Sequence, residues 1–151
     1  GGSQYAKFVA PALVEIIVDE VTLKNSVRQN AAIALCRLGL VLPAEVVRSL
    51  SGIVPRVCEL IASLTDDHEK ITSFTGLCFM LKADTSVFVR DFGHVAAAMA
   101  SWSHPPPEPL VSMHRQVLIA FKSQAGPAGW ESTVKSLSEQ VPVELQRLYG
   151  V

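Results

Sequence analysis

The sequence repeats itself at an interval of a little over forty residues, and this repeat constrains the fold more than any other feature. The segment from Pro11 to Ile17 returns as the segment from Pro55 to Ile61, with Pro, Glu and Ile in register 44 residues on. A second series lies 43 residues apart, with Ala34, Leu35 and Leu38 opposite Leu77, Cys78 and Leu81. A unit this short buries its apolar face only against its neighbours, so the chain is expected to be a stack of similar units.

The apolar spacing inside these units is helical. Between residues 26 and 40 the apolar positions recur at intervals of three and four: Val27, Ala31, Ala34, Leu35 and Leu38. The β-branched stretches are short and have no paired hairpin turns. Because a period of about 40–47 residues is typical of HEAT or armadillo helix pairs, we predict an all-α fold. The expected architecture is an α-α superhelix, a HEAT-repeat solenoid of about three to three and a half repeats.

The repeats predict one domain over residues 1–151, divided at 1–42, 43–84, 85–125 and a C-terminal cap at 126–151. Inner helices are expected at 26–40 and 67–82 and from near residue 109, and outer helices at 4–18, 44–64, 86–102 and 129–140, with a last turn at 143–148. Pro11 and Pro55 fall inside two outer helices and predict the same kink in both. The four prolines between residues 105 and 109 predict a rigid, extended connection between helices, in preference to a polyproline ligand for a partner.

Helix ends are expected where residues with short polar side chains or no side chain occur. Asn25 or Ser26 is a candidate N-cap of the first inner helix, and Gly39 suits a left-handed turn near its end. The adjacent acids Asp66 and Asp67 suit the start of the second inner helix, because negative charge is favourable at a helix N-terminus.

Composition excludes several classes of protein. Apolar residues make up 49% and charged residues 18%, which excludes intrinsic disorder. Thirteen basic residues against fourteen acidic ones leave no positive excess, so no direct nucleic-acid partner is expected. No apolar run is long enough for a transmembrane helix, so no membrane partner is expected either. The mean hydropathy of +0.32 favours surfaces covered by neighbouring protein.

The residues carry little that suggests catalysis. There is no GxSxG nucleophile motif and no glycine-rich phosphate loop, so we predict that the chain is not an enzyme and takes no cofactor or metal. Trp102 and Trp130 are expected to pack between repeats. The three cysteines form no CxxC pair and are expected to be small buried side chains in a reducing compartment, which favours cytosol or nucleus: Cys36, Cys58 and Cys78.

A more specific resemblance comes from a series of motifs in order along the chain. It begins with the run from Val27 to Gly39 and continues as Pro43-Ala44-Glu45-Val46, Asp67-His68-Glu69-Lys70, Phe74-Thr75-Gly76-Leu77-Cys78, Ala98-Met99-Ala100-Ser101-Trp102, Phe121-Lys122 and Tyr149-Gly150-Val151. In this order the motifs resemble the C-terminal HEAT repeats of the transportin family, nuclear import receptors of the karyopherin-β class. Three features depart from the family pattern: Arg56 follows Pro55 where an aromatic is usual, Thr85-Ser86 replaces an Asn-Pro turn, and the loop at Pro105-Pro106-Pro107 is one residue longer.

The resemblance implies a part of a longer receptor that shuttles between cytoplasm and nucleus. Such a receptor binds the basic, proline-tyrosine nuclear localisation signals of cargo proteins and contacts nucleoporins. Ran-GTP regulates it through N-terminal repeats that this chain does not contain. The end preceding the first helix would then be covered in the full receptor, and we expect the isolated chain to self-associate through Phe8, Leu13 and Ile17.

The resemblance also implies a cargo site on the inner helices. The matching helix offers Ser26, Asn30 and Ile33 on one stripe, with Arg37 as its weakest member because a cation opposes a basic signal. Asn30 is expected to bond an extended peptide backbone and Ile33 to meet an apolar side chain. The alternative is that Asn30 stabilises repeat stacking and Ile33 belongs to the core.

Two other functions remain open from the sequence. The chain can be a HEAT-repeat scaffold of a cytosolic complex unrelated to nuclear transport, or a helical-bundle enzyme with an unrecognised site. Binding of basic proline-tyrosine peptides distinguishes the import receptor from the scaffold.

Overall fold

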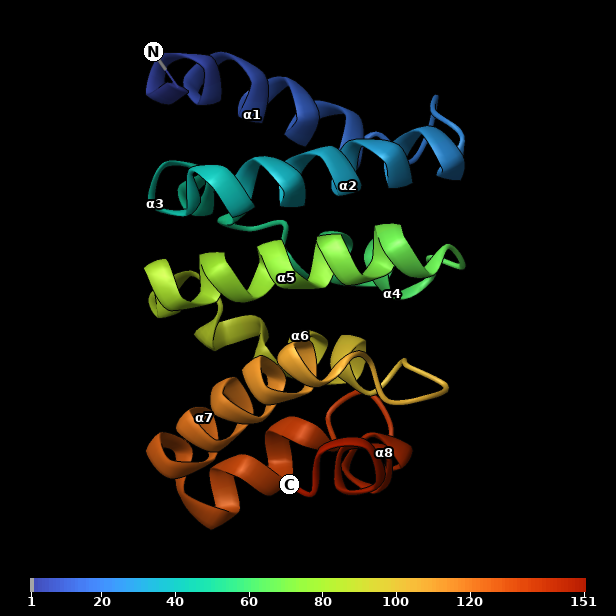
Figure 1. The fold of residues 1–151 in the computed structure, drawn as a ribbon, viewed down its shortest axis with the longest axis vertical. Coiled ribbons are helices and arrows are strands. Elements are labelled where there is room, and N and C mark those ends of the chain that lie inside the picture. Colours follow the sequence, from blue (N-terminus) through green and yellow to red (C-terminus); the bar gives the residue numbers. More distant parts are fainter. Residues whose placement is uncertain (1) are drawn as a thin grey trace.

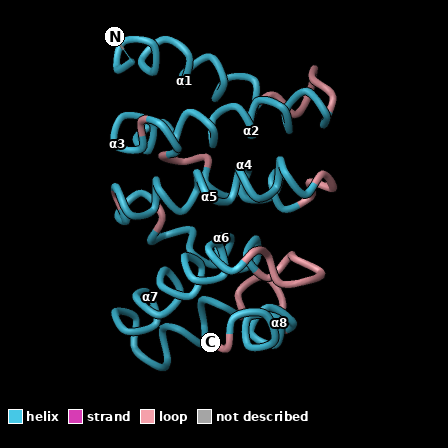
Figure 2. Tube along the Cα trace, viewed as in Figure 1, coloured by secondary structure: helices cyan, strands magenta, loops and turns pink. Residues whose placement is uncertain are grey.

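A computed structural model describes residues 2–151 as a stack of helices, and no strand occurs within that range (Figures 1 and 2). This confirms the predicted all-α fold class. The helices are α1 (Gly2–Val18), α2 (Asn25–Val41), α3 (Pro43–Val46), α4 (Val54–Ala62), α5 (Asp67–Ala83), α6 (Phe92–Met99), α7 (Glu108–Val134) and α8 (Gln140–Tyr149). Three short 3-10 turns, η1 (Val47–Leu50), η2 (Thr85–Val87) and η3 (Val89–Asp91), lie between them.

The helices form two rows. In the inner row α2 packs against α5 and α5 against α7, and in the outer row α1 reaches α3 and α4 while α4 packs against α6. Figure 1 shows α2 and α5 running side by side, with α7 tilted away from them and α8 at the far end of the stack. Sequence-adjacent helices therefore pair antiparallel, and each pair contacts the next, as a helical repeat requires.

Two glycines let α2 and α5 approach each other closely. A Cβ on Gly76 would lie 2.0 Å from the Cys36 carbonyl oxygen, and a Cβ on Gly39 would lie 2.6 Å from the Met80 sulfur. Gly39 is therefore a packing residue inside α2, and the prediction that it forms a left-handed helix end is wrong. At Gly76 only a hydrogen fits, because the facing atoms belong to the Cys36 backbone, whereas at Gly39 the facing atoms belong to the Met80 side chain.

The expected outer helix over 44–64 is broken in the structure. After α3 and η1 the chain turns at Gly52, and α4 begins only at Val54. Gly52 has a φ of 80°, which glycine adopts readily and other residues adopt only with strain. Pro55 consequently lies in the first turn of α4, where its missing N–H costs nothing. The predicted second kink is therefore wrong, and only Pro11 lies inside a helix of this pair.

The third outer helix and the long α7 also differ from their predicted bounds. The segment expected as one helix over 86–102 is two 3-10 turns followed by α6. In α7 the backbone turns at Gly126, with φ 74° and ψ 170°, and Pro127 begins the second half of the helix, which ends at Val134 instead of 140. The proline segment before α7 lies outside the helices, and Pro107 at its end has the extended backbone angles φ −52° and ψ 147°.

Helix starts follow the predicted chemistry at one of two sites. Asp66 caps α5, because its carboxylate accepts a hydrogen bond from the Glu69 backbone N–H at 2.9 Å. At α2 the prediction is wrong: Lys24 is the N-cap, it forms no side-chain cap, and Asn25 is already helical.

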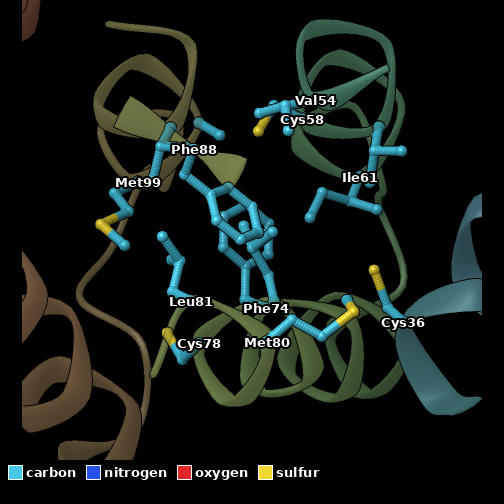
Figure 3. Close-up of a cluster of buried hydrophobic side chains, with 14 of the residues drawn as sticks. Cys36, Val54, Cys58, Ile61, Phe74, Cys78, Met80, Leu81, Phe88 and Met99 are labelled. Carbon is cyan, nitrogen blue, oxygen red and sulfur yellow. The ribbon is translucent and has the colours of Figure 1, made fainter. Parts of the chain in front are cut away.

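The core lies between the two rows. Figure 3 shows Phe74 and Phe88 directed toward each other, with Met80, Leu81 and Met99 around them. All five side chains are buried. Packing of these large side chains from both rows contributes to the apolar burial that holds the repeats together.

The three cysteines are free and buried, as predicted, and come from α2, α4 and α5. Burial raises the pKa of Cys36 and of Cys78 to about 12 and raises the pKa of Cys58 as well. These thiols therefore pack as small apolar side chains and have little thiolate character.

A buried polar pair attaches α8 to the stack. The Tyr149 hydroxyl donates to the Met99 carbonyl oxygen at 2.6 Å, and His114 Nδ1 lies 2.9 Å from the same hydroxyl oxygen. Because the tyrosine proton is already used, Nδ1 carries the imidazole proton and donates it to Tyr149. His114 Nε2 is buried without a hydrogen-bond partner among the described residues, so a protonated ring would place an unpaired N–H and a charge in the core. Burial accordingly lowers the pKa of His114 to about 3.

The exposed surface of α1 carries two large aromatic side chains. Phe8 is 83% exposed and Tyr5 is 61% exposed, while Leu13 is half-buried. Ile17 is fully buried, so its predicted place on this surface is wrong; its side chain packs in the core. Self-association through this surface stays a prediction.

Replacing Gly76 by Ala tests the α2–α5 contact. The added Cβ clashes with the Cys36 carbonyl oxygen, so we expect a loss of about 3 kcal/mol in the free energy of unfolding, at the upper end of overpacking costs. Urea titration followed by circular dichroism measures this loss. Gly129→Ala is the control, since only Ala125 on the preceding turn lies near its Cβ, and it should change stability by less than about 1 kcal/mol. Equal stability of the two variants would contradict the close contact.

Stability should depend on pH through His114. Its pKa is about 6.5 when unfolded and about 3 when folded, so the unfolded chain binds the extra proton between these values. The free energy of unfolding is therefore highest above pH 6.5 and falls as the pH drops toward 3, by up to about 4 kcal/mol from this group.

The His114→Phe variant should lose this part of the pH dependence, whereas His104→Phe, at an exposed position, should keep it. Thermal melts between pH 4 and pH 7.5 provide the measurement. A steep acid loss that is unchanged in His114→Phe would assign the dependence to other groups.

Candidate functional site on the inner row of helices

The exposed face of α2 carries most of the predicted cargo-binding stripe. Ser26, Asn30 and Arg37 are all exposed and lie within about one third of the helix circumference. Among residues 2–151 none of these three side chains takes part in a hydrogen bond or an ion pair. Their polar groups are therefore available to a ligand. The structure thus brings Ser26 and Asn30 to one surface.

Ile33 lies at the edge of this stripe and is only 3% exposed. Its side chain belongs to the core that the inner helices share with the outer row. A side chain so completely covered contacts a bound peptide only if the packing around it opens. We therefore assign Ile33 to packing, which is the second of the two roles that the sequence left open.

The neighbouring helix α5 adds an apolar contact to the same face. Phe79 is 38% exposed although it is a large aromatic residue in the middle of the stack. About two turns before Phe79 in α5, Thr72 donates its hydroxyl proton to the His68 carbonyl oxygen at 2.9 Å, so this hydroxyl is already used inside the helix. The exposed face of the inner row, which we define as Ser26, Asn30, Arg37 and Phe79, thus combines free polar groups with one aromatic surface.

Sequence reasoning did not select Phe79. The residue lies outside the apolar series Leu77, Cys78 and Leu81 that repeats the pattern of α2. Its position outside this series was the sequence feature that could have indicated an exposed aromatic residue. An aromatic residue on the polar side of an amphipathic helix is a candidate contact residue.

A polar cluster fixes the beginning of α2. Arg28 is buried and donates from Nε to the Ile17 carbonyl oxygen at 2.8 Å, and its guanidinium lies 3.5 Å from a Glu20 carboxylate oxygen. The same carboxylate oxygen lies 3.4 Å from Arg56 Nε, at the start of α4. Gln29 donates to the Ser63 hydroxyl at 2.9 Å. These contacts join the α1–α2 pair to α4 and hold Ser26 and Asn30 in position.

A second group of contacts surrounds Trp102, at the start of the proline connection. Its ring meets Phe74 edge-on at 5.4 Å between centroids, and the Lys70 ammonium lies 4.8 Å from its centroid. Burial lowers the pKa of Lys70, whose Nζ donates to the Ala62 carbonyl oxygen. Trp102 is buried, which confirms its predicted packing role, and Trp130 is half-buried against Phe121.

The described residues form no group of three or more side chains suited to hold a metal ion. Over the same range, every helix is too short or too polar to cross a bilayer.

Comparison with known proteins gives a consistent result. Mouse and human transportin-1 are each 34% identical to the chain over 151 residues, covering 97% of this chain and 16% of the transportin. Rice transportin-1 is 33% identical over 143 residues, covering 95% of this chain. The chain is transportin-like. The transportin of Dictyostelium discoideum matches more weakly, at 27% identity over 82% of the chain.

These matches confirm the predicted resemblance to transportins, and the helical stack agrees with it. The chain spans only 16% of the length of the mouse, human and rice transportins that it matches. No family model matches the sequence.

Alanine substitutions separate the packing residue from the exposed one. Ile33→Ala removes buried methylene groups and should lower the free energy of unfolding by about 2–4 kcal/mol. Asn30→Ala, at an exposed helical position, should change it by less than about 0.5 kcal/mol. Thermal and urea melts of the 151-residue chain measure both values. A destabilising Asn30→Ala would instead give Asn30 a role in repeat stacking.

Proposed function

We propose that this chain is part of a nuclear import receptor of the transportin type. The similarity to transportin-1 over 97% of the chain is the observation that carries this proposal. In this proposal the receptor binds cargo proteins through their basic, proline-tyrosine localisation signals and shuttles between cytoplasm and nucleus. Ran-GTP and nucleoporins act on it through parts of the receptor outside the chain.

Within the chain, the exposed face of the inner row is the proposed contact for cargo. An extended peptide leaves its backbone N–H and C=O groups unpaired, and the Asn30 amide supplies both a donor and an acceptor for them. Ser26, one helical turn away, supplies a hydroxyl, and Phe79 offers an aromatic surface to proline or tyrosine rings of the signal. Arg37 repels a basic segment, so we place the basic part of the signal away from it.

The division into repeats at 1–42, 43–84 and 85–125 with a cap at 126–151 is part of the same proposal. Each of the first three segments then contributes one inner helix, α2, α5 or α7, to a continuous surface. Consecutive inner helices of this kind suit an extended ligand, because each repeat adds one more contact along it.

Titration of the receptor with capped basic proline-tyrosine peptides tests this function. Asn30→Ala should weaken binding about five-fold, which corresponds to the loss of roughly one hydrogen bond. Asn25→Ala is the matched control, since Asn25 is also exposed on α2 but points away from the stripe, and it should leave affinity unchanged.

The same titration with scrambled peptides decides between receptor and scaffold. A scrambled peptide that binds as tightly as the signal, or an unchanged affinity in Asn30→Ala for every signal tested, would reject the proposed cargo contact. Thermal melts run beside the titration exclude a change in folding as the cause of any loss.

A further inference from the structure

The tilt of α7 relative to α5 opens a pocket between them. Where α2 and α5 meet, glycines let the backbones approach closely, but α7 diverges from the C-terminal end of α5 (Figure 1). A cavity of about 250 Å³ lies at this divergence. Its lining comes from the end of α5, the turn η2, the start of α6 and the middle of α7: Leu81, Lys82, Thr85, Phe92, Gln116, Val117, Ala120, Phe121 and Gln124.

The interior of this pocket is apolar. Phe92 and Phe121 stack face to face, with centroids 3.9 Å apart and ring planes inclined by 8°. Leu81 and Phe92 are buried, whereas Val117 and Phe121 are only partly covered and present the open apolar surface. An aromatic pair already fixed by stacking forms a binding surface that a ligand does not have to order.

The rim of the pocket is polar and carries a positive charge. Gln116, Ala120 and Gln124 are spaced at four-residue intervals, so the small Ala120 leaves the opening clear between two amide side chains. All three are exposed. Lys82 is the one charged residue among the lining residues. Two amides suit the backbone groups of an extended chain, and the ammonium group favours a neighbouring carboxylate.

The size of the pocket restricts its occupant. Small-molecule sites usually have volumes of about 300–1,000 Å³, and a helix with its side chains is about 10–12 Å across, so this pocket is small for both. One large apolar side chain from an extended segment suits such a space.

We propose that this pocket anchors a single aromatic side chain of an extended peptide in which acidic residues flank the aromatic one. The aromatic ring enters between Phe121 and Val117, Gln116 and Gln124 bond the peptide backbone, and Lys82 pairs with an acidic side chain. The site uses none of the residues proposed for basic cargo signals and prefers peptides of opposite charge. It therefore stands or fails independently of that function.

The test uses a capped, fluorescein-labelled peptide in which one Phe is flanked by two Asp on each side, at low ionic strength. Fluorescence anisotropy of this peptide with the 151-residue chain should show saturable binding. Replacing the peptide Phe by Ala should weaken it about ten-fold or more, because most of the affinity comes from burying the ring. Replacing the Asp residues of the peptide by Lys should also weaken its binding.

Two protein variants locate the site. Ala120→Leu places a side chain in the opening and should weaken binding about ten-fold, whereas Ala128→Leu adds the same side chain at another exposed alanine of α7 and should leave binding unchanged. Lys82→Glu should weaken binding of the acidic peptide and strengthen binding of the Lys-flanked one. Melting curves of all three variants should match that of the unaltered chain.

Several results would overturn the proposal. These are equal affinity for the Phe and Ala peptides, equal affinity of Ala120→Leu and Ala128→Leu, and tighter binding of the Lys-flanked peptide to the unaltered chain. Sedimentation that shows self-association abolished by Ala120→Leu would assign the pocket to a second copy of the chain and also reject it. If Ala120→Leu does not fold, the peptide substitutions and Lys82→Glu still decide the question.

Discussion

The close approach of Gly76 in α5 to the Cys36 carbonyl oxygen in α2 sets the spacing of these two inner helices. Because no side chain intervenes there, α2 and α5 approach closely and their larger residues are displaced toward the outer row. Phe74 points from α5 toward the outer helices, as Figure 3 shows, whereas the Met80 side chain lies against Gly39 of α2. The exposed face that carries Asn30 thus lies on the side of the closely packed α2–α5 pair that is turned away from the outer row.

Buried polar groups then fix parts of the stack that apolar packing alone would leave free to slide. Arg28 ties the end of α1 to α2, and His114 with Tyr149 ties α8 to α6 and α7. Apolar contacts are nondirectional, whereas these hydrogen bonds are satisfied in one register only. The two ends of the stack therefore have defined positions, and the pockets between the helices keep their shape.

The sequence predicted the helical class and the inner helices well, because the apolar spacing of α2 and α5 repeats almost without interruption. It failed where one residue can serve two purposes. Gly39 suits a helix end and a close contact equally, and Pro55 suits a kink and a first turn; tertiary packing decides between these roles. At the candidate site, the shared stripe of Ser26 and Asn30 was predicted from helical spacing together with the family resemblance, but the burial of Ile33 depends on how the inner helices rotate against the core. The pocket beside Ala120 was not predictable, because it arises from the tilt of α7 and not from a motif.

The arrangement of the cysteines has a practical consequence. Each of the three thiols is buried in a different helix, and burial keeps all of them protonated at neutral pH. Thiol-specific reagents require an accessible thiolate, so they do not react with these cysteines in the folded chain. They react only where local unfolding exposes a thiol. A cysteine introduced on the surface can thus carry a dye or spin label without removal of the native ones. The slow labelling rates of Cys36, Cys58 and Cys78 then measure the local unfolding of successive repeats.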